Sequence, residues 1–340
     1  MSFLNNKYYS KAELLKQVGI IDQICGVRIS ELNDGFERGV RVADFYTASG
    51  LRYTVTIDRG LDISSAEFNG ISLSFRSPNG DVHPSFYDPS NKEWLRTFKG
   101  GLMTTCGLTY LGSPCVDEGE ELGLHGRISN IPARNISYGG YWLNDDYYIF
   151  IEGTVREAVQ FGDNILLTRR IESKLGESKI VINDVIRNEG YKKSPFMILY
   201  HCNIGFPLLD EGCKLITNAK NITPRDEDAR KGFSNIYNFT LPIKDFKEQV
   251  FYFDMEDTEP IVELQNLNKN LSLIIKYSKK ELPNFILWKM LGEGTYVLGL
   301  EPANCLVEGR DIERKRGTLQ FLEPGEERNI KLEIEVKNLQ

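Results

Sequence analysis

The chain has 340 residues, of which 41% are hydrophobic and 26% charged, with a net charge of -7 and a pI near 5.3. Such a composition is typical of a soluble globular protein. The acidic balance argues against a nucleic acid or an anionic membrane as partner, because either would favour a basic face. No apolar run approaches the roughly 18 residues of a membrane helix. The N-terminus lacks a signal-like core and the six cysteines form no Cys-x-x-Cys pair, which predicts a cytoplasmic protein.

The first predicted element is a short helix. Ser10 and Glu13 form the pattern of a capping box, which predicts a helix over residues 11–18. After it the helical period nearly disappears, and short segments rich in β-branched and aromatic residues follow, several of them alternating polar with apolar side chains. The clearest predicted strands are residues 40–43, 53–57, 147–151, 165–168, 179–182, 271–276 and 330–336.

Turn signals separate these strands, at Asn69-Gly70, Asn79-Gly80, Asn188-Glu-Gly190 and Glu323-Pro-Gly325. This succession predicts an all-β sandwich or barrel, since a parallel α/β fold would need helical crossovers. No repeat or linker interrupts the chain. We therefore expect one domain over residues 1–340, with a helical lead-in at 1–35 and the β-sandwich at 36–340. The polar stretch 223–257 is interpreted as an insertion or a long loop.

Two apolar segments end in polar side chains that could carry chemistry. Glu301 follows the apolar run 297–300, where an unpaired buried carboxylate would be costly. It either pairs with a cation such as Lys289 or Arg310, or lines a polar pocket. His201 follows the apolar run 196–200, as a satisfied core histidine or as an acid–base group. An acid and an imidazole on rigid strands could exchange protons with a small molecule.

The other two histidines carry weaker signals. His125 lies between glycines, which let the backbone approach a ligand closely. It is either a turn histidine bonded to a backbone carbonyl or a ligand-binding residue, whereas His83, before Pro84, is interpreted as incidental. Three histidines without metal-ligand spacing do not predict a zinc site. The chain also lacks a nucleophile elbow, a phosphate-binding loop and a dinucleotide fingerprint.

Four segments, in this order along the chain, resemble motifs of the galactose mutarotase-like superfamily, the aldose 1-epimerases. The matching segments are Lys99-Gly-Gly, His125-Gly126 with Asn130-Ile-Pro132, His201-Cys-Asn203, and Leu300-Glu301-Pro302. Residues 58–62, 125–127 and 299–304 also resemble a less characterised, aldose 1-epimerase-like branch. The resemblance implies a supersandwich of antiparallel β-sheets with an open concave face.

The resemblance also implies roles and a carbohydrate substrate. Glu301 is expected to be the general base that draws the anomeric proton, and a protonated His201 the general acid that serves the ring oxygen. His125 is expected to hold a ring oxygen or a hydroxyl. Ring opening, rotation and closure then interconvert the α and β anomers without metal or cofactor. A nearby carboxylate is expected to raise the protonated fraction of His201.

Several residues depart from the family pattern. Lys99 stands where the family has an arginine, so a single ammonium charge replaces a guanidinium that can donate two parallel hydrogen bonds. Arg127 stands at a usually apolar position, and the substrate-contacting aspartate has no clear match beyond Asp226 or Asp228. The predicted substrate-binding residues are His125, Arg127, Lys99, Asn203, Arg59, Lys289, Trp288 and Arg225. Their cations suggest a sugar carrying a carboxylate, sulfonate or phosphate, unless they pair with Asp58, Asp62 and Glu308.

Other functions remain open at this point. An epimerase or isomerase acting at another sugar carbon could use the same acid and base, and a non-catalytic sugar-binding protein could keep the fold. A glycoside hydrolase normally needs two carboxylates, of which the sequence identifies one. Trp288 either stacks on a sugar or packs in the core. The sequence does not predict an oligomeric state.

Overall fold

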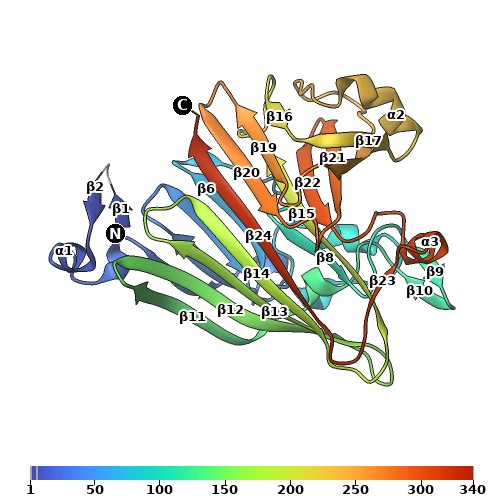
Figure 1. The fold of residues 1–340 in the computed structure, drawn as a ribbon, viewed down its shortest axis with the longest axis horizontal. Coiled ribbons are helices and arrows are strands. Elements are labelled where there is room, and N and C mark those ends of the chain that lie inside the picture. Colours follow the sequence, from blue (N-terminus) through green and yellow to red (C-terminus); the bar gives the residue numbers. More distant parts are fainter. Residues whose placement is uncertain (1, 5–6, 340) are drawn as a thin grey trace.

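The computed structural model describes residues 2–4 and 7–339, and antiparallel β-sheets make up most of it (Figure 1). Three large sheets contain eight, seven and five strands. This arrangement confirms the predicted all-β sandwich architecture.

The eight-stranded sheet runs in the order β11-β12-β13-β14-β24-β20-β19-β16. Its strands alternate buried with half-buried or exposed side chains, as in β14, so one face packs on the core and the other faces water. The strands are β11 (Arg134–Leu143), β12 (Asp146–Ala158), β13 (Asn164–Lys174), β14 (Lys179–Asn188), β24 (Glu327–Asn338), β20 (Leu271–Tyr277), β19 (Ile261–Asn266) and β16 (Lys214–Ile216).

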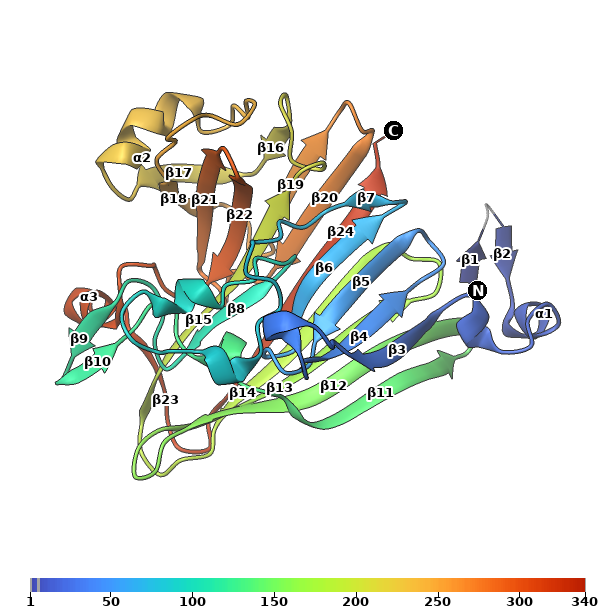
Figure 2. The same ribbon diagram turned by 180° about the vertical axis from the view of Figure 1, so that it is seen from behind.

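The five-stranded sheet covers the core face of the eight-stranded sheet (Figure 2). Apolar side chains of both sheets, such as Phe45 and Val55 on one and Ile149 and Ile182 on the other, belong to one buried cluster. The strands, in sheet order, are β3 (Gly26–Glu31), β4 (Arg41–Tyr46), β5 (Leu51–Thr56), β6 (Asp62–Phe68) and β7 (Ile71–Ser72). β3 lies within the segment 1–35 that was expected to be a helical lead-in.

The seven-stranded sheet carries the candidate site. Its order is β17-β18-β21-β22-β15-β23, and β8 also pairs with β15. The strands are β17 (Ala219–Pro224), β18 (Gln249–Met255), β21 (Asn284–Gly292), β22 (Thr295–Ala303), β15 (Ser194–Gly205), β23 (Gln320–Leu322) and β8 (Thr104–Leu108).

Segment 223–257 is in part the long connection that was expected and in part strand, because residues 225–248 join β17 to β18 and residues 249–255 belong to the sheet. It includes α2 (Glu227–Gly232) and ends in β18, which pairs with β21. Its polar composition comes from the connection before β18, and the apolar strand 249–255 was overlooked behind it. Three side chains from this region, Arg225, Glu248 and Val250, line the candidate site, as described below.

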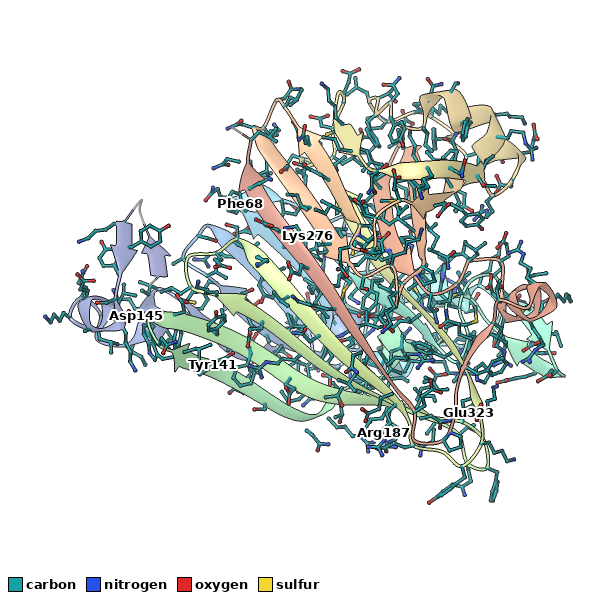
Figure 3. All side chains as sticks on the ribbon, viewed as in Figure 1. Phe68, Tyr141, Asp145, Arg187, Lys276 and Glu323 are labelled. Atoms are coloured by element: carbon teal, nitrogen blue, oxygen red, sulfur yellow. The ribbon has the colours of Figure 1, made fainter. Side chains whose placement is uncertain are left out.

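The remaining elements are short. The helix α1 (Lys11–Leu15) begins with the predicted capping box of Ser10 and Glu13 and ends before Val18. Asp145, at the turn between β11 and β12, accepts a hydrogen bond from the Lys11 backbone N–H at 3.0 Å and ties this helix to the sheet (Figure 3). The others are α3 (Arg310–Arg316), the hairpins β1–β2 (Ser2–Leu4, Lys7–Tyr9) and β9–β10 (Cys115–Asp117, Glu120–Leu122), and 3-10 turns at Ile21–Gln23, Gly35–Glu37, Pro84–Phe86, Glu93–Arg96, Ile128–Asn130 and Phe233–Asn235. None of the described helices is long and apolar enough to cross a membrane.

Candidate active site

The pairing of β15 with β22 brings His201 and Glu301 together. Cys202 lies opposite Leu300 in this antiparallel pair, so the two polar residues become neighbours across the strands. His201 Nε2 and Glu301 Oε1 are 3.2 Å apart, and their side chains are only 7% and 3% exposed. Both strands continue past these residues, to Gly205 and Ala303, so the pair lies within the strands and not at their tips.

The pair forms part of the wall of a cavity of about 390 Å³. His125 lies on the same wall, with its ring centroid 6.0 Å from that of His201 and the two rings nearly perpendicular. Aromatic side chains surround the imidazoles, with Trp94 at 4.9 Å from His125 and Trp288 at 5.2 Å from His201. The other lining residues are Lys92, Leu95, Phe98, Ser113, Pro114, Leu124, Arg225, Glu248, Val250, Ile286 and Val307.

A glycine provides the space in which the Glu301 carboxyl group lies. Gly299 precedes Glu301 by two residues on β22 and pairs with Trp288 on β21. A Cβ atom at Gly299 would lie 2.3 Å from Glu301 Oε1 and 2.9 Å from the Trp288 Cβ. Any larger residue would therefore displace the carboxyl group or the indole.

The turn that carries His125 is held by close backbone packing. His125 has a φ of +58° and Gly126 one of +79°, a left-handed conformation that glycine tolerates best. A Cβ atom at Gly126 would lie 2.3 Å from the Gly107 carbonyl oxygen, at the edge of β8. Gly126 thus serves this close approach, and His125 lines the cavity.

Three buried polar atoms of the site have no hydrogen-bond partner among the described residues: His125 Nδ1, His201 Nδ1 and Glu301 Oε1. Buried polar atoms in folded proteins are nearly always bonded, because an unbonded one costs roughly 1–3 kcal/mol. The site therefore contains hydrogen-bonding capacity that the described residues leave unused.

Burial sets the protonation states of the ligand-free site. It raises the pKa of Glu301 well above its usual range, and the Glu248 carboxylate adds to the shift. Burial and the neighbouring His125 lower the pKa of His201 to about 3, and burial lowers the pKa of His125 to about 4. Both shifts favour the uncharged forms of the two groups, in contrast to the ionised Glu301 and protonated His201 that the resemblance implies.

A second carboxylate at the cavity, Glu248, was missed by the sequence analysis. It accepts hydrogen bonds from the Arg225 guanidinium at 2.9 Å and from the Trp288 indole N–H at 3.1 Å. The two aspartates considered for this position do not line the cavity, since Asp226 caps α2 and Asp228 lies on its exposed surface. Recognising β18 as a strand would have revealed Glu248 as the residue just before it.

Three of the predicted substrate-binding cations are engaged inside the protein and do not line the cavity. Lys99 is fully buried and pairs with Asp62 at 3.1 Å. Arg59 donates to the backbone carbonyls of Ser129, Val82 and Thr97, each at 2.7 Å. Lys289 donates to the carbonyls of Asn235 and Asn238 at 2.6 and 2.7 Å. Their substrate-contacting roles are corrected accordingly, because each cation is held by acceptors distant in the sequence.

Two more predicted residues lie close to the cavity without lining it. Asn203 is buried, and its amide donates to the His201 carbonyl at 2.8 Å, which braces the backbone of β15. Arg127 faces a neighbouring groove. Arg225 and Trp288, in contrast, line the cavity as predicted.

The alternatives for Glu301 are also resolved. Lys289 bonds to backbone carbonyls, and Arg310 pairs with Asp117 at 2.6 Å and Glu120 at 2.8 Å. Neither cation pairs with Glu301, which lines the polar pocket instead.

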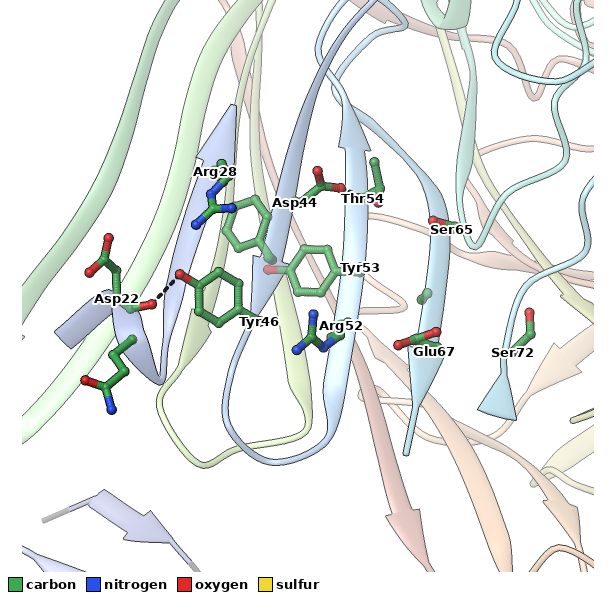
Figure 4. Close-up of a pocket in the computed structure, with 13 residues that line it drawn as sticks. Asp22, Arg28, Asp44, Tyr46, Arg52, Tyr53, Thr54, Ser65, Glu67 and Ser72 are labelled. Atoms are coloured by element: carbon green, nitrogen blue, oxygen red, sulfur yellow. Dashed lines mark hydrogen bonds between the residues drawn. The ribbon is translucent and has the colours of Figure 1, made fainter. Parts of the chain in front are cut away.

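A larger hollow, of about 700 Å³, lies on the outer face of the five-stranded sheet (Figure 4). Tyr46, Arg52, Asp44 and Glu67 are among its lining residues, and the Tyr46 hydroxyl donates to the Asp22 carbonyl. No histidine lines it, so it lacks the acid–base pair found in the smaller cavity. Within residues 2–4 and 7–339, no group of three or more His, Cys, Asp or Glu side chains could hold a metal ion.

Comparison with known proteins assigns the chain to a family. Residues 37–336 match the profile of a family described as a domain of unknown function, DUF4432. The chain belongs to the DUF4432 family. No curated protein matches it in sequence.

Solved structures place this DUF4432 protein in the galactose mutarotase-like fold. It is similar to a candidate aldose 1-epimerase from Klebsiella pneumoniae subsp. pneumoniae, with 25% identity and a TM-score of 0.87 over 93% of this chain and 85% of that one. A galactose mutarotase-like protein from Clostridium acetobutylicum has 12% identity and a TM-score of 0.66, over 92% and 98% of the two chains. A galactose 1-epimerase from Lactobacillus acidophilus has 14% identity and a TM-score of 0.60, over 92% and 99%. The last two show the fold alone, and the resemblance noted from the sequence is confirmed.

Proposed function

We propose that this DUF4432 protein is a cofactor-independent isomerase that interconverts the α and β anomers of an aldose. The observation that carries the proposal is the 3.2 Å approach of His201 Nε2 to Glu301 Oε1 at the wall of a cavity with free polar atoms. Ring opening of an aldose needs one group to take a proton and another to give one, and a paired carboxyl and imidazole can do both.

The proposed reaction uses the single proton that the pair shares. Burial disfavours the charged form of each group and so favours the arrangement in which this proton is on Glu301. A sugar hydroxyl that donates to Oε1 would stabilise the carboxylate form, and the proton would then pass to His201. Glu301 draws the anomeric proton while His201 protonates the ring oxygen. The ring opens to the aldehyde, the carbonyl carbon rotates, and closure on its other face reverses both transfers.

The proposed substrate of the catalytic cavity is a neutral aldose. Of the cations expected to bind an acidic sugar, Lys99 is neutralised by Asp62, and Arg225 is paired with Glu248 and Asp226. The other two expected counter-ions are occupied elsewhere, since Asp58 pairs with Arg41 and Glu308 with Arg316. Glu248 and the free histidine nitrogens suit hydroxyl groups, and the rings of Trp288 and Phe98 suit the apolar face of a sugar.

Anomer exchange measured by NMR over a panel of aldoses tests the proposal. We expect the wild-type protein to accelerate exchange of at least one aldose, and Glu301→Gln and His201→Asn each to lower kcat by about 10²- to 10⁴-fold. Glu323→Gln serves as the control, because this carboxylate is exposed on a turn and outside the cavity (Figure 3).

Two results would decide against the proposal. A protein that binds sugars but leaves their exchange rates unchanged would be a sugar-binding protein, for which the two variants would matter only through affinity. Inversion of the configuration at another carbon, with the rate of anomer exchange unchanged by the protein, would identify an epimerase that acts at that carbon.

A further inference from the structure

A second hollow adjoins the catalytic cavity. It is a groove of about 430 Å³, which we call the side groove, lined by Pro89, Ser90, Asn91, Pro114, Cys115, Val116, Glu121, Leu122, Gly123 and Arg127. Pro114 lines both the side groove and the catalytic cavity. The two spaces are therefore neighbours across a single wall.

Two chain segments form this wall by close backbone contact. The Leu124 N–H donates to the Asn91 carbonyl at 2.7 Å, and a Cβ atom at Gly123 would lie 2.0 Å from the Pro89 carbonyl oxygen. Along both segments, adjacent residues face different spaces. Asn91 and Gly123 line the side groove, whereas their neighbours Lys92 and Leu124 line the catalytic cavity.

The turn that holds His125 also supplies a residue to the side groove. His125 lines the catalytic cavity and Arg127, two residues later, lines the side groove. Because Gly126 is packed against the Gly107 carbonyl, the positions of these two side chains are fixed relative to each other. A ligand that extends from one space into the other would meet both.

Arg127 is not engaged by the protein in the way that the buried cations are. Its side chain is 35% exposed, and its charged partner, Glu157, lies 3.8 Å away. Glu157 already accepts hydrogen bonds from the Leu108 N–H at 2.8 Å and the Thr109 hydroxyl at 2.6 Å. Among the described residues no hydrogen bond from the Arg127 guanidinium is found; the guanidinium lies 4.9 Å from the centre of the Tyr110 ring, and Arg127 lines the side groove.

The chemistry of the side groove favours a neutral polyhydroxy ligand. Arg127 offers donors and Glu121 offers acceptors, and their opposite charges disfavour an ion of either sign. Asn91 and Ser90 add further polar groups, and the rings of Pro89 and Pro114 provide apolar surface. This combination of polar pairs with flat apolar patches is that of a small-molecule site.

We propose that the side groove binds the second sugar unit of a reducing disaccharide or oligosaccharide whose reducing end occupies the catalytic cavity. The proposal rests on the proposed function, because it assumes that a reducing sugar unit is held beside His201 and Glu301. It identifies Arg127, Glu121 and Val116 as specificity-determining residues that do not touch the reacting atoms.

The test compares monosaccharides with their own disaccharides. Anomer exchange is measured by NMR for glucose with maltose and for galactose with lactose, using wild type, Val116→Trp and Arg127→Gln. Val116 is 62% exposed, so a larger side chain there fills the groove without entering the core. We expect the ratio of kcat/KM for disaccharide over monosaccharide to exceed one in the wild type and to fall at least tenfold in both variants. Arg187→Gln is the control, since this arginine pairs with Glu327 on the eight-stranded sheet (Figure 3).

The outcomes separate this inference from the proposed function. Two results would overturn the role of the side groove and leave the isomerase in place. The first is exchange of monosaccharides with no preference for disaccharides. The second is a ratio of kcat/KM for disaccharide over monosaccharide that Val116→Trp leaves unchanged. Absence of all exchange overturns the isomerase. In that case calorimetric titration with the same sugars still tests the groove, which requires tighter binding of disaccharides by wild type than by Val116→Trp.

Discussion

Two clusters of buried ionisable groups lie on opposite faces of β15 and differ in how they are bonded. His201 faces the catalytic cavity, where its Nδ1 atom has no partner in the described part of the chain. The preceding residue, Tyr200, donates to Asp184 at 2.6 Å on the other side. Asp184 also binds Arg169, which binds Asp62 at 3.1 Å, and Asp62 accepts from Lys99 at 3.1 Å as well.

The comparison separates two uses of buried charge. In the Asp62–Arg169 cluster, all four charged side chains are fully buried, and two acids balance two bases with short hydrogen bonds. The cavity wall is nearly as buried but leaves three polar atoms unbonded. The saturated charges join β6, β13 and β14 through Asp62, Arg169 and Asp184, whereas the polar atoms of the cavity wall are left unsaturated. Substitutions in the first cluster should cost stability, and those in the second should cost activity.

The largest effect is expected from Asp62→Asn. Removing this charge leaves the Lys99 ammonium buried without its carboxylate, and breaking a buried pair typically costs about 3–5 kcal/mol. Chemical denaturation should show a loss of this size. The matched control is Asp254→Asn, whose exposed pair with Lys279 should contribute less than about 1 kcal/mol. Equal losses in the two variants would contradict the distinction.

Gly299→Ala should lower activity by about tenfold, or about 1.4 kcal/mol in transition-state stabilisation. The new Cβ atom would lie 2.3 Å from Glu301 Oε1 and would displace the carboxyl group from His201. Anomer-exchange kinetics check the effect, and a fall in kcat with little change in KM distinguishes a misplaced carboxyl from a damaged sugar pocket. Gly19→Ala is the control, because nothing lies within 4 Å of a Cβ atom there. Unchanged kcat in Gly299→Ala would show that the carboxyl position is not critical.

The pH dependence should show histidines shifted to low pKa. The pKa values of His125 and His201 are lowered to about 4 and about 3, so both stay neutral well below 6.5. We expect kcat/KM to be flat between pH 7 and 5 and to fall below about pH 4. The same shifts should reduce stability as the pH falls from 6.5, because the unfolded chain takes up the protons first. A fall of kcat/KM with a midpoint near pH 6.5 would mean instead that the imidazoles are solvated.

The smallest effect is expected from Glu301→Gln on stability. A protonated carboxyl and an amide have nearly the same shape, and Oε1 has no hydrogen bond to lose in the empty cavity. The free energy of unfolding at pH 7 should therefore stay within about 0.5 kcal/mol of the wild type. A loss of several kcal/mol in the denaturation curve would indicate that Glu301 is ionised and bonded in the free protein.

Local patterns in the sequence predicted the parts of the fold that depend on neighbouring residues. The capping box at Ser10 and the alternating strands are examples, and the strands 271–276 and 330–336 lie within the observed β20 and β24. Glu301 and His201 could be identified because each ends an apolar run, a position at which a carboxyl or imidazole side chain has few other roles. The solved structures then confirmed the fold that the motif order implied.

Long-range pairing accounts for what the sequence did not predict. Lys99 meets Asp62 and Arg169 meets Asp62 across 37 and 107 positions, so neither pairing leaves a local pattern. Lys99 and Arg59 could be assigned to the substrate only because their true acceptors were not visible. Glu248 was missed for a related reason, since it contacts Trp288 from 40 positions away and precedes a strand hidden behind a polar segment.

The backbone contact at Gly126 bears on how this protein could diversify. No side chain fits against the Gly107 carbonyl, and none fits at Gly299 without displacing Glu301. The backbone around the cavity thus tolerates little sequence drift, whereas Lys92 and Glu248 are exposed at the edge of the cavity and Val116 is exposed in the side groove. New sugar preferences would arise by exchange of these edge residues around an unchanged proton-transfer pair.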